Sequence, residues 1–151
     1  MKIRLLSVGR DKSGLFAPAV ELYAERIRRH LPFELLELPP SRHRSPERAR
    51  AEEGERILAA TEGRRRVALD ERGRALGSVD FARRLERWML ERQDVDFIVG
   101  GDEGLDPRVR EAADAVLSLG PMTLPHRLAR VVVAEQIYRA LSILAGTPYH
   151  K

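Results

Sequence analysis

Residues 115–145 read AVLSLGPMTLPHRLARVVVAEQIYRALSILA, which places a short apolar strand, a loop and a long helix in direct succession. The loop contains a glycine, two prolines and several apolar side chains, whereas a loop in solvent is normally polar. We therefore expect this loop to be buried or to line an apolar pocket of the kind that accepts an adenine ring. The helix is apolar on nearly every side, which predicts that a second subunit covers part of it.

Towards the N-terminus the chain alternates between strand-like and helix-like patterns of apolar residues. Strands are expected at residues 3–8, 33–38, 67–69, 95–99 and 115–119. Helices are expected between residues 20 and 31, from 46 to about 61, after a cap at Ser78, after Asp106, and from about 127 to 145. This alternation predicts an α/β fold with a mainly parallel sheet and helices on both faces. The length of 151 residues favours one domain.

Ligands of parallel sheets bind at the carboxyl ends of the strands. This rule selects the loop after Leu69, the loop GGDEG at residues 100–104 and the loop GPMTLPH at residues 120–126. Glycines in such loops allow the backbone to approach a ligand closely. The GGDEG loop superficially resembles the GGDEF signature of diguanylate cyclases. That signature lies in a hairpin between strands, whereas here Asp106 and Pro107 begin a helix, so the cyclase interpretation is not favoured.

The composition excludes several classes of protein. The chain has no cysteine, so disulfide scaffolds, thiolate zinc sites and cysteine nucleophiles are excluded. It has no apolar tract long enough to cross a bilayer and no signal-peptide pattern at its start, which predicts a cytoplasmic protein without membrane contact. The net charge is +4, and almost all of the 27 basic residues are arginine. This bias fits a nucleic-acid partner, but genomic base composition or adaptation to heat explains it equally well.

Few polar residues are placed for chemistry. His126 stands at the start of the long helix, and the terminal Tyr149, His150 and Lys151 bring a phenol, an imidazole and an ammonium group together. A frayed end is the alternative interpretation of this tail. No group of carboxylates and histidines has the spacing of metal ligands, so no metal is expected.

The segments IVGGDEGLDP, LSLGPMTLPHRLARVVVAEQIYRA and PYHK together resemble the large-subunit ribosomal RNA methyltransferase H family of the SPOUT superfamily. The segments KIRLLSVGR, FELLEL and EGERIL match the family pattern in the same order, so the resemblance covers essentially the whole chain. It implies a SPOUT-type fold with a C-terminal trefoil knot and a homodimer. It also implies methyl transfer from S-adenosylmethionine to N3 of a pseudouridine in 23S ribosomal RNA, on the assembled ribosome.

The resemblance assigns roles to particular positions. The implied cofactor contacts are Leu69, Gly101, Gly120, Pro121, Met122, Thr123, Leu124 and Pro125. The catalytic candidates are His126, Arg130, Tyr149 and His150, and the choice of base among them stays open. The family commonly has proline at the position of Asp102, and serine and alanine at Gly120 and Pro121.

Two other functions fit parts of the sequence. A non-catalytic ribosome-binding or RNA-binding assembly factor would explain the arginine content and the small size. A related knotted methyltransferase that acts on tRNA is the second alternative, although such enzymes usually carry additional RNA-binding sequence.

Overall fold

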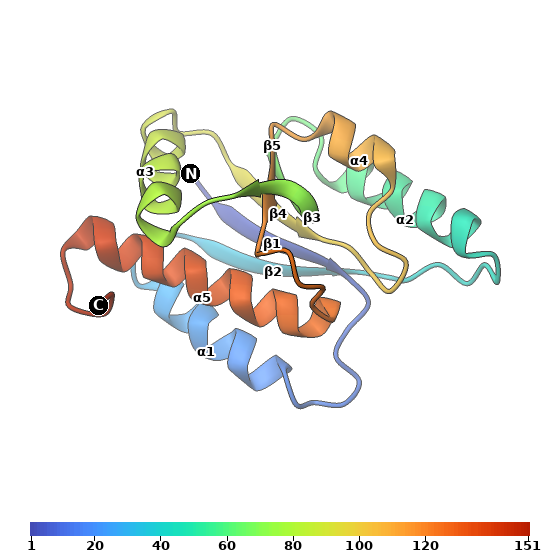
Figure 1. Cartoon of the computed structure of the whole chain (residues 1–151), viewed down its shortest axis with the longest axis horizontal. Coiled ribbons are helices and arrows are strands. Elements are labelled where there is room, and N and C mark those ends of the chain that lie inside the picture. Colours follow the sequence, from blue (N-terminus) through green and yellow to red (C-terminus); the bar gives the residue numbers. More distant parts are fainter.

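The computed structural model describes residues 1–151 and contains one five-stranded sheet (Figure 1). All neighbouring strands are parallel, and their order is β2-β1-β4-β3-β5. The strands are β1 (Ile3–Val8), β2 (Phe33–Leu38), β3 (Arg65–Ala75), β4 (Val95–Val99) and β5 (Ala115–Ser118). The predicted α/β fold with a parallel sheet is therefore confirmed, while the trefoil knot that the resemblance implies stays a prediction.

Helices cover both faces of this sheet, as predicted. They are α1 (Ala17–Arg28), α2 (Pro46–Ala60), α3 (Ser78–Leu90), α4 (Pro107–Ala112) and α5 (His126–Ala145). Helices α1, α3 and α5 share one core with the sheet, and α2 and α4 share a second, smaller core on the opposite face. The strands supply both cores because their side chains alternate: Leu5 belongs to the first core and its neighbour Leu6 to the second.

Strand β3 is much longer than the sequence predicts. It spans 11 residues and pairs with β5 in two places, with an irregularity between Leu69 and Arg74. Gly73 makes this possible, because a β-carbon at that position would lie 2.6 Å from the carbonyl oxygen of Val116. The prediction of a strand ending at Leu69 followed by a turn was wrong, because the close approach of Gly73 to β5 allows pairing to resume after the irregularity.

Ser78 does not cap α3, contrary to the prediction. Gly77 is the N-cap residue, and the Ser78 hydroxyl donates instead to Gln136 Oε1 of α5 at 2.8 Å. Side chains do cap two other helices, because Ser45 accepts from the Arg48 amide of α2 and Asp106 accepts from the Arg108 amide of α4.

A network of ion pairs closes the amino-terminal edge of the sheet. Asp96 of β4 is fully buried and accepts hydrogen bonds from Arg4 Nε at 2.7 Å and from Arg64 Nε at 2.8 Å. Arg64 also bonds Asp94 at 2.8 Å. One carboxylate therefore links β1 and β4 to the start of β3.

Replacing Asp96 with asparagine should lower the free energy of unfolding by about 2 kcal/mol, because two largely buried guanidinium groups lose their shared counter-charge. Urea denaturation followed by circular dichroism measures this change. The control is Asp80→Asn, which removes an exposed 3.6 Å pair with Arg83 and should change stability by less than about 0.5 kcal/mol. Equal denaturation midpoints for the two variants would contradict a stabilising role for Asp96.

Candidate active site

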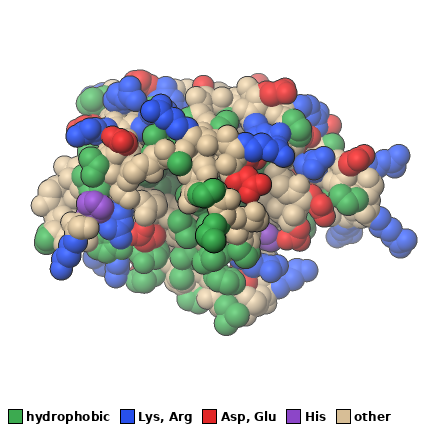
Figure 2. Space-filling view, viewed as in Figure 1, with side chains coloured by type: hydrophobic (Ala, Val, Ile, Leu, Met, Phe, Trp, Pro, Cys, Tyr) green, Lys and Arg blue, Asp and Glu red, His purple; other side chains and the backbone are tan.

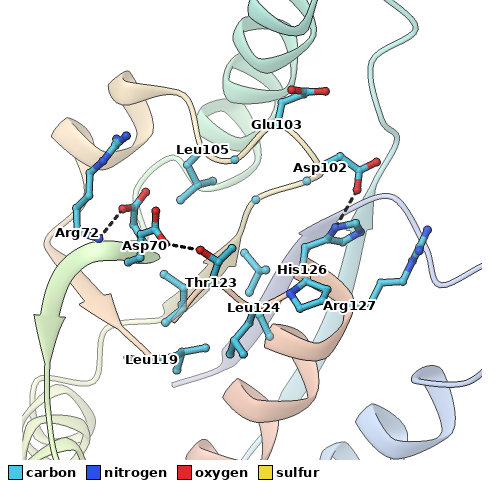
Figure 3. Close-up of a pocket in the computed structure, with 18 of the residues that line it drawn as sticks. Asp70, Arg72, Asp102, Glu103, Leu105, Leu119, Thr123, Leu124, His126 and Arg127 are labelled. Carbon is cyan, nitrogen blue, oxygen red and sulfur yellow. Dashed lines mark hydrogen bonds and ion pairs between the residues drawn. The ribbon is translucent and has the colours of Figure 1, made fainter. Parts of the chain in front are cut away.

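A cavity of about 1020 Å³ lies at the carboxyl ends of β4 and β5 and beside the irregular part of β3 (Figure 3). The three loops that the strand-end rule selected in the sequence supply most of its wall. The cavity is lined by Leu69 and the residues after it, by Gly100–Gly104 and by most of the loop before α5. The structure therefore brings these three separate segments to one cavity.

Most of the expected cofactor residues line this cavity. They are Leu69, Gly101, Gly120, Met122, Thr123, Leu124 and Pro125. Pro121 is exposed and is not part of the wall. The loops also bond to one another, because the Thr123 hydroxyl donates to Glu71 Oε2 at 3.0 Å and so joins the segment after β5 to the irregular part of β3.

A second, more apolar cavity of about 290 Å³ adjoins the first. It lies between β3, β5 and the helices α3 and α5, and nine of its 14 lining residues are hydrophobic. Leu69, Leu119 and Gly120 belong to the walls of both cavities. The two spaces therefore form adjacent compartments, one mainly apolar and one bordered by charged side chains.

Two glycines of these loops have different functions. Gly120 has a φ of +132°, and a β-carbon there would meet no atom within 4 Å. Gly120 thus provides a backbone conformation that other residues rarely adopt, beside open space. A β-carbon at Gly101 would instead lie 3.3 Å from Glu53 Oε1 and 3.4 Å from Val8 Cβ. The absence of a side chain at Gly101 therefore lets the backbone after β4 pack closely against Glu53 of α2 and Val8 of β1, and a β-carbon there would point toward these residues.

His126 begins α5 at the edge of the larger cavity. Its Nδ1 lies 3.0 Å from Asp102 Oδ1, and the His126 side chain is mostly buried while that of Asp102 is exposed (Figure 3). A carboxylate at Nδ1 favours the tautomer that carries its proton there and leaves Nε2 as an acceptor.

Arg127, the next residue, also lines the cavity, and its Nε lies 3.8 Å from Asp11 Oδ1. The Ser13 hydroxyl and backbone amides hold the pKa of Asp11 at about 2, so this carboxylate is charged.

Arg130, one turn further along α5, does not line either cavity. Its side chain is 6 % exposed and donates from Nη2 to Glu37 Oε1 at the end of β2, at 3.1 Å. Its Nε has no hydrogen-bond partner. In this position Arg130 fixes the start of α5 to the sheet rather than facing the cavity directly.

The C-terminal tail lies away from His126 within the same chain. Tyr149 donates to Glu135 Oε1 at 3.2 Å and packs on Tyr138, while His150 Nδ1 lies 3.0 Å from Arg139 Nη1. Glu135 follows His126 by nine residues, which on a helix is about 14 Å along the axis and about half a turn around it. One chain therefore brings His126 and Arg130 together near the cavity but leaves Tyr149 and His150 on the far side of α5.

The environment of Tyr149 is unfavourable for its ionised form. Burial, together with the negative charge of Glu135, raises the pKa of Tyr149 to about 12. The phenol is therefore protonated near neutral pH in this arrangement and can donate a hydrogen bond but not accept a proton.

The burial of the loop and helix differs in part from the prediction. The loop was expected to be buried or to line an apolar pocket, and Met122, which is 82 % exposed, is not buried but lines the larger cavity. Helix α5 has no exposed side chain before Ala145. Much of this cover comes from α1 and α3, which pack against α5 in the same chain. Burial of α5 is thus explained largely without a second subunit, and the homodimer stays a prediction.

The sequence did not identify several of the lining residues as part of the site. They are Phe16, Arg50, Asp70, Arg72, Arg110 and Arg127 around the larger cavity, and Leu76, Ser78 and Gln136 around the apolar one. The irregular part of β3 brings Asp70 and Arg72 to the site, and only Gly73 indicates this irregularity in the sequence.

No group of three or more histidine or acidic side chains is placed to hold a metal ion. None of the helices has both the length and the apolar character needed to span a membrane.

Comparison with known proteins gives consistent results. A family model described as "Predicted SPOUT methyltransferase" matches residues 1–150. Proteins named "Ribosomal RNA large subunit methyltransferase H" from Anaeromyxobacter sp. (strain K) and Thermus thermophilus are 53 % and 44 % identical to this chain, with 100 % of the chain and at least 99 % of each relative covered.

Solved structures share the fold at lower sequence identity. A probable methyltransferase from Bordetella pertussis matches with a TM-score of 0.59 and 20 % identity over 92 % of this chain and 93 % of that one. The SpoU methyltransferase AviRb from Streptomyces viridochromogenes, solved in complex with AdoMet, matches with a TM-score of 0.50 and 16 % identity. That match covers 95 % of this chain and 58 % of AviRb.

Proposed function

Since this chain belongs to the SPOUT methyltransferase family, we propose that it transfers a methyl group from S-adenosylmethionine to large-subunit ribosomal RNA. We propose N3 of a pseudouridine as the methylated atom and the assembled ribosome as the substrate. The active protein in this proposal is a cytoplasmic homodimer in which residues 1–151 form one catalytic domain.

The pair of adjoining cavities is the observation that carries this proposal. S-adenosylmethionine combines a flat adenine ring with a charged amino-acid end, so it needs an apolar compartment beside a polar one. The smaller cavity supplies apolar side chains together with Ser78 and Gln136. The larger one contains Asp70, Arg72 and Arg110 for the charged end. The cofactor would place its methyl group near Leu69, Leu119 and Gly120, where the two cavities meet.

S-adenosylmethionine supplies an electrophilic methyl group, and the target nitrogen must lose a proton before or during its attack. His126 has the position and the tautomer for accepting that proton, because Asp102 occupies Nδ1 and leaves Nε2 free. Asp102 is a positioning residue in this scheme. Proline, which the resemblance gives as the common residue of the family at this position, cannot make this contact.

The other catalytic candidates take supporting roles. Arg130 holds the start of α5, and hence His126, against the end of β2 through Glu37. Tyr149 and His150 are too far from the cavity of their own chain, so we propose that they contact the target base bound to the partner subunit. With a protonated phenol, Tyr149 acts there as a hydrogen-bond donor.

Two measurements on the purified protein test the function. Calorimetric titration with S-adenosylmethionine should show binding, and tritiated methyl transfer should label large-subunit RNA in intact ribosomes. Mass spectrometry of nuclease digests then identifies the modified base. Absence of cofactor binding, or label found only in tRNA, would contradict the proposal.

Filling the apolar cavity should block the cofactor. Val132 of α5 lines this cavity, so Val132→Trp should lower the affinity for S-adenosylmethionine by at least roughly 30-fold, because an indole would occupy the space needed by adenine. The control is Val79→Trp at an exposed position of α3, which should bind the cofactor as the wild type does. Circular dichroism confirms that both variants are folded. A folded Val132→Trp protein with unchanged affinity would remove this cavity from the cofactor site.

A further inference from the structure

Several arginine side chains near the strand ends form ion pairs, including Arg110, Arg127 and Arg130 at the carboxyl edge of the sheet, but three arginines at that edge do not. At the amino-terminal edge, Arg4, Arg64 and Arg65 all form ion pairs with acidic residues. At the carboxyl edge, Arg42, Arg44 and Arg48 are exposed, and none of the ion pairs in the structure involves them. Contacts within the chain do not explain why arginine stands at these three positions, because none of the three side chains forms an ion pair or hydrogen bond.

These arginines lie on an ordered segment, Ser41–Arg50, that we call the arginine arm. The buried carboxylate of Glu53 accepts from the Ser41 amide at 2.9 Å, and His43 Nε2 lies 2.9 Å from Glu52 Oε2. The Ser45 hydroxyl then caps α2. The acidic residues beside the arm are thus used to hold its backbone and His43, which leaves the guanidinium groups free.

The arm is continuous with the candidate active site. Arg50, its last residue, lines the larger cavity. In Figure 1 the start of α2 projects at the right-hand end of the molecule, on the side where the strands end. Figure 2, drawn from the same direction, shows Lys or Arg side chains in blue at this tip. A polyanion that reaches from the cavity to the tip would therefore pass along these arginines.

We propose that the arginine arm binds backbone phosphates of the RNA that carries the target nucleotide. The proposal rests on the proposed function, since it assumes an RNA substrate at the cavity. Exposed guanidinium groups bind phosphate oxygens bidentately, and such contacts position an RNA without reading its sequence. Glu47 is the one acidic side chain on the arm, and it leaves the segment with a clear excess of positive charge.

The test compares two triple variants that remove the same charge. Arg42→Gln/Arg44→Gln/Arg48→Gln neutralises the arm. Arg83→Gln/Arg87→Gln/Arg92→Gln neutralises exposed arginines in and directly after α3, at the other end of the molecule. Binding to purified ribosomes and to protein-free large-subunit RNA is measured by filter retention over a range of salt concentrations. Cofactor affinity is measured by calorimetry.

The arm variant should bind both RNA samples at least about tenfold more weakly, and the slope of log affinity against log salt should fall by about 2 to 3. The α3 variant should change affinity less than about threefold. The KM for ribosomes should rise in the arm variant while kcat and cofactor affinity stay at wild-type values.

Three results would overturn the proposal: wild-type RNA affinity in the arm variant, an equal loss in both variants, or a loss confined to ribosomes with protein-free RNA bound normally. The last would assign the arm to a ribosomal protein. Failure of the proposed function is a separate result, seen as a wild-type protein that binds no S-adenosylmethionine and transfers no methyl group, while the RNA-binding comparison can still be made.

Discussion

Replacing His126 with alanine should slow methyl transfer to ribosomes by about 100- to 10,000-fold, the usual contribution of a positioned general base. Affinity for S-adenosylmethionine should stay within about threefold of the wild type, because removing the imidazole leaves the apolar cavity unchanged. Single-turnover kinetics with saturating cofactor measures the chemical step directly.

Two further variants separate proton transfer from positioning. His126→Asn keeps a donor toward Asp102 but has no basic nitrogen, so it should be nearly as slow as His126→Ala. Asp102→Asn should cost about tenfold or less, because the imidazole stays in place but loses the carboxylate that orients it. Wild-type rates for His126→Asn would exclude His126 as the base.

Deleting Tyr149, His150 and Lys151 should reduce turnover by about 100-fold while cofactor affinity is nearly unchanged, because loss of alignment is costly in a displacement reaction. The tail packs on Glu135 and Arg139, away from both cavities, so its removal leaves the cofactor site complete. Tyr149→Phe should keep activity within about tenfold, since it retains the ring and loses only the hydrogen bond of a phenol that stays protonated.

Mixing the deletion variant with His126→Ala tests whether the tail acts across the dimer. Each protein alone is nearly inactive, but a mixed dimer contains one site with an intact His126 and the intact tail of the partner. Random exchange should restore about a quarter of wild-type activity if the interface is a symmetric two-fold. Native mass spectrometry verifies that mixed dimers form. Mixed dimers without recovered activity would show that the tail does not act in trans.

The sequence predicts the architecture well because the spacing of apolar residues indicates which side of each strand or helix is buried. The runs at β1 and β4 are apolar enough to identify buried strands, and the rule for strand ends then locates the cavity. What the sequence does not contain is the pairing between distant segments. The second half of β3 depends on a contact between Gly73 and Val116, and the ion pair of His126 depends on where the GGDEG loop turns.

The position of the C-terminal tail also could not be predicted from the sequence. Grouping Tyr149 and His150 with His126 followed from their chemistry, but helix geometry sets these residues on opposite sides of α5. Residue type alone cannot reveal this separation, because it depends on how the last residues fold back after Gly146 (φ +73°) ends the helix.

The two edges of the sheet are specialised for different purposes. The carboxylate of Asp96 ties the amino-terminal edge together, whereas the opposite edge consists of loops whose side chains surround the cavities. Loops on a rigid scaffold tolerate exchange of residues far better than the scaffold does. In such a protein, mutation can adjust the choice of substrate at one edge while the other preserves the fold, so specificity can diverge among descendants without loss of stability.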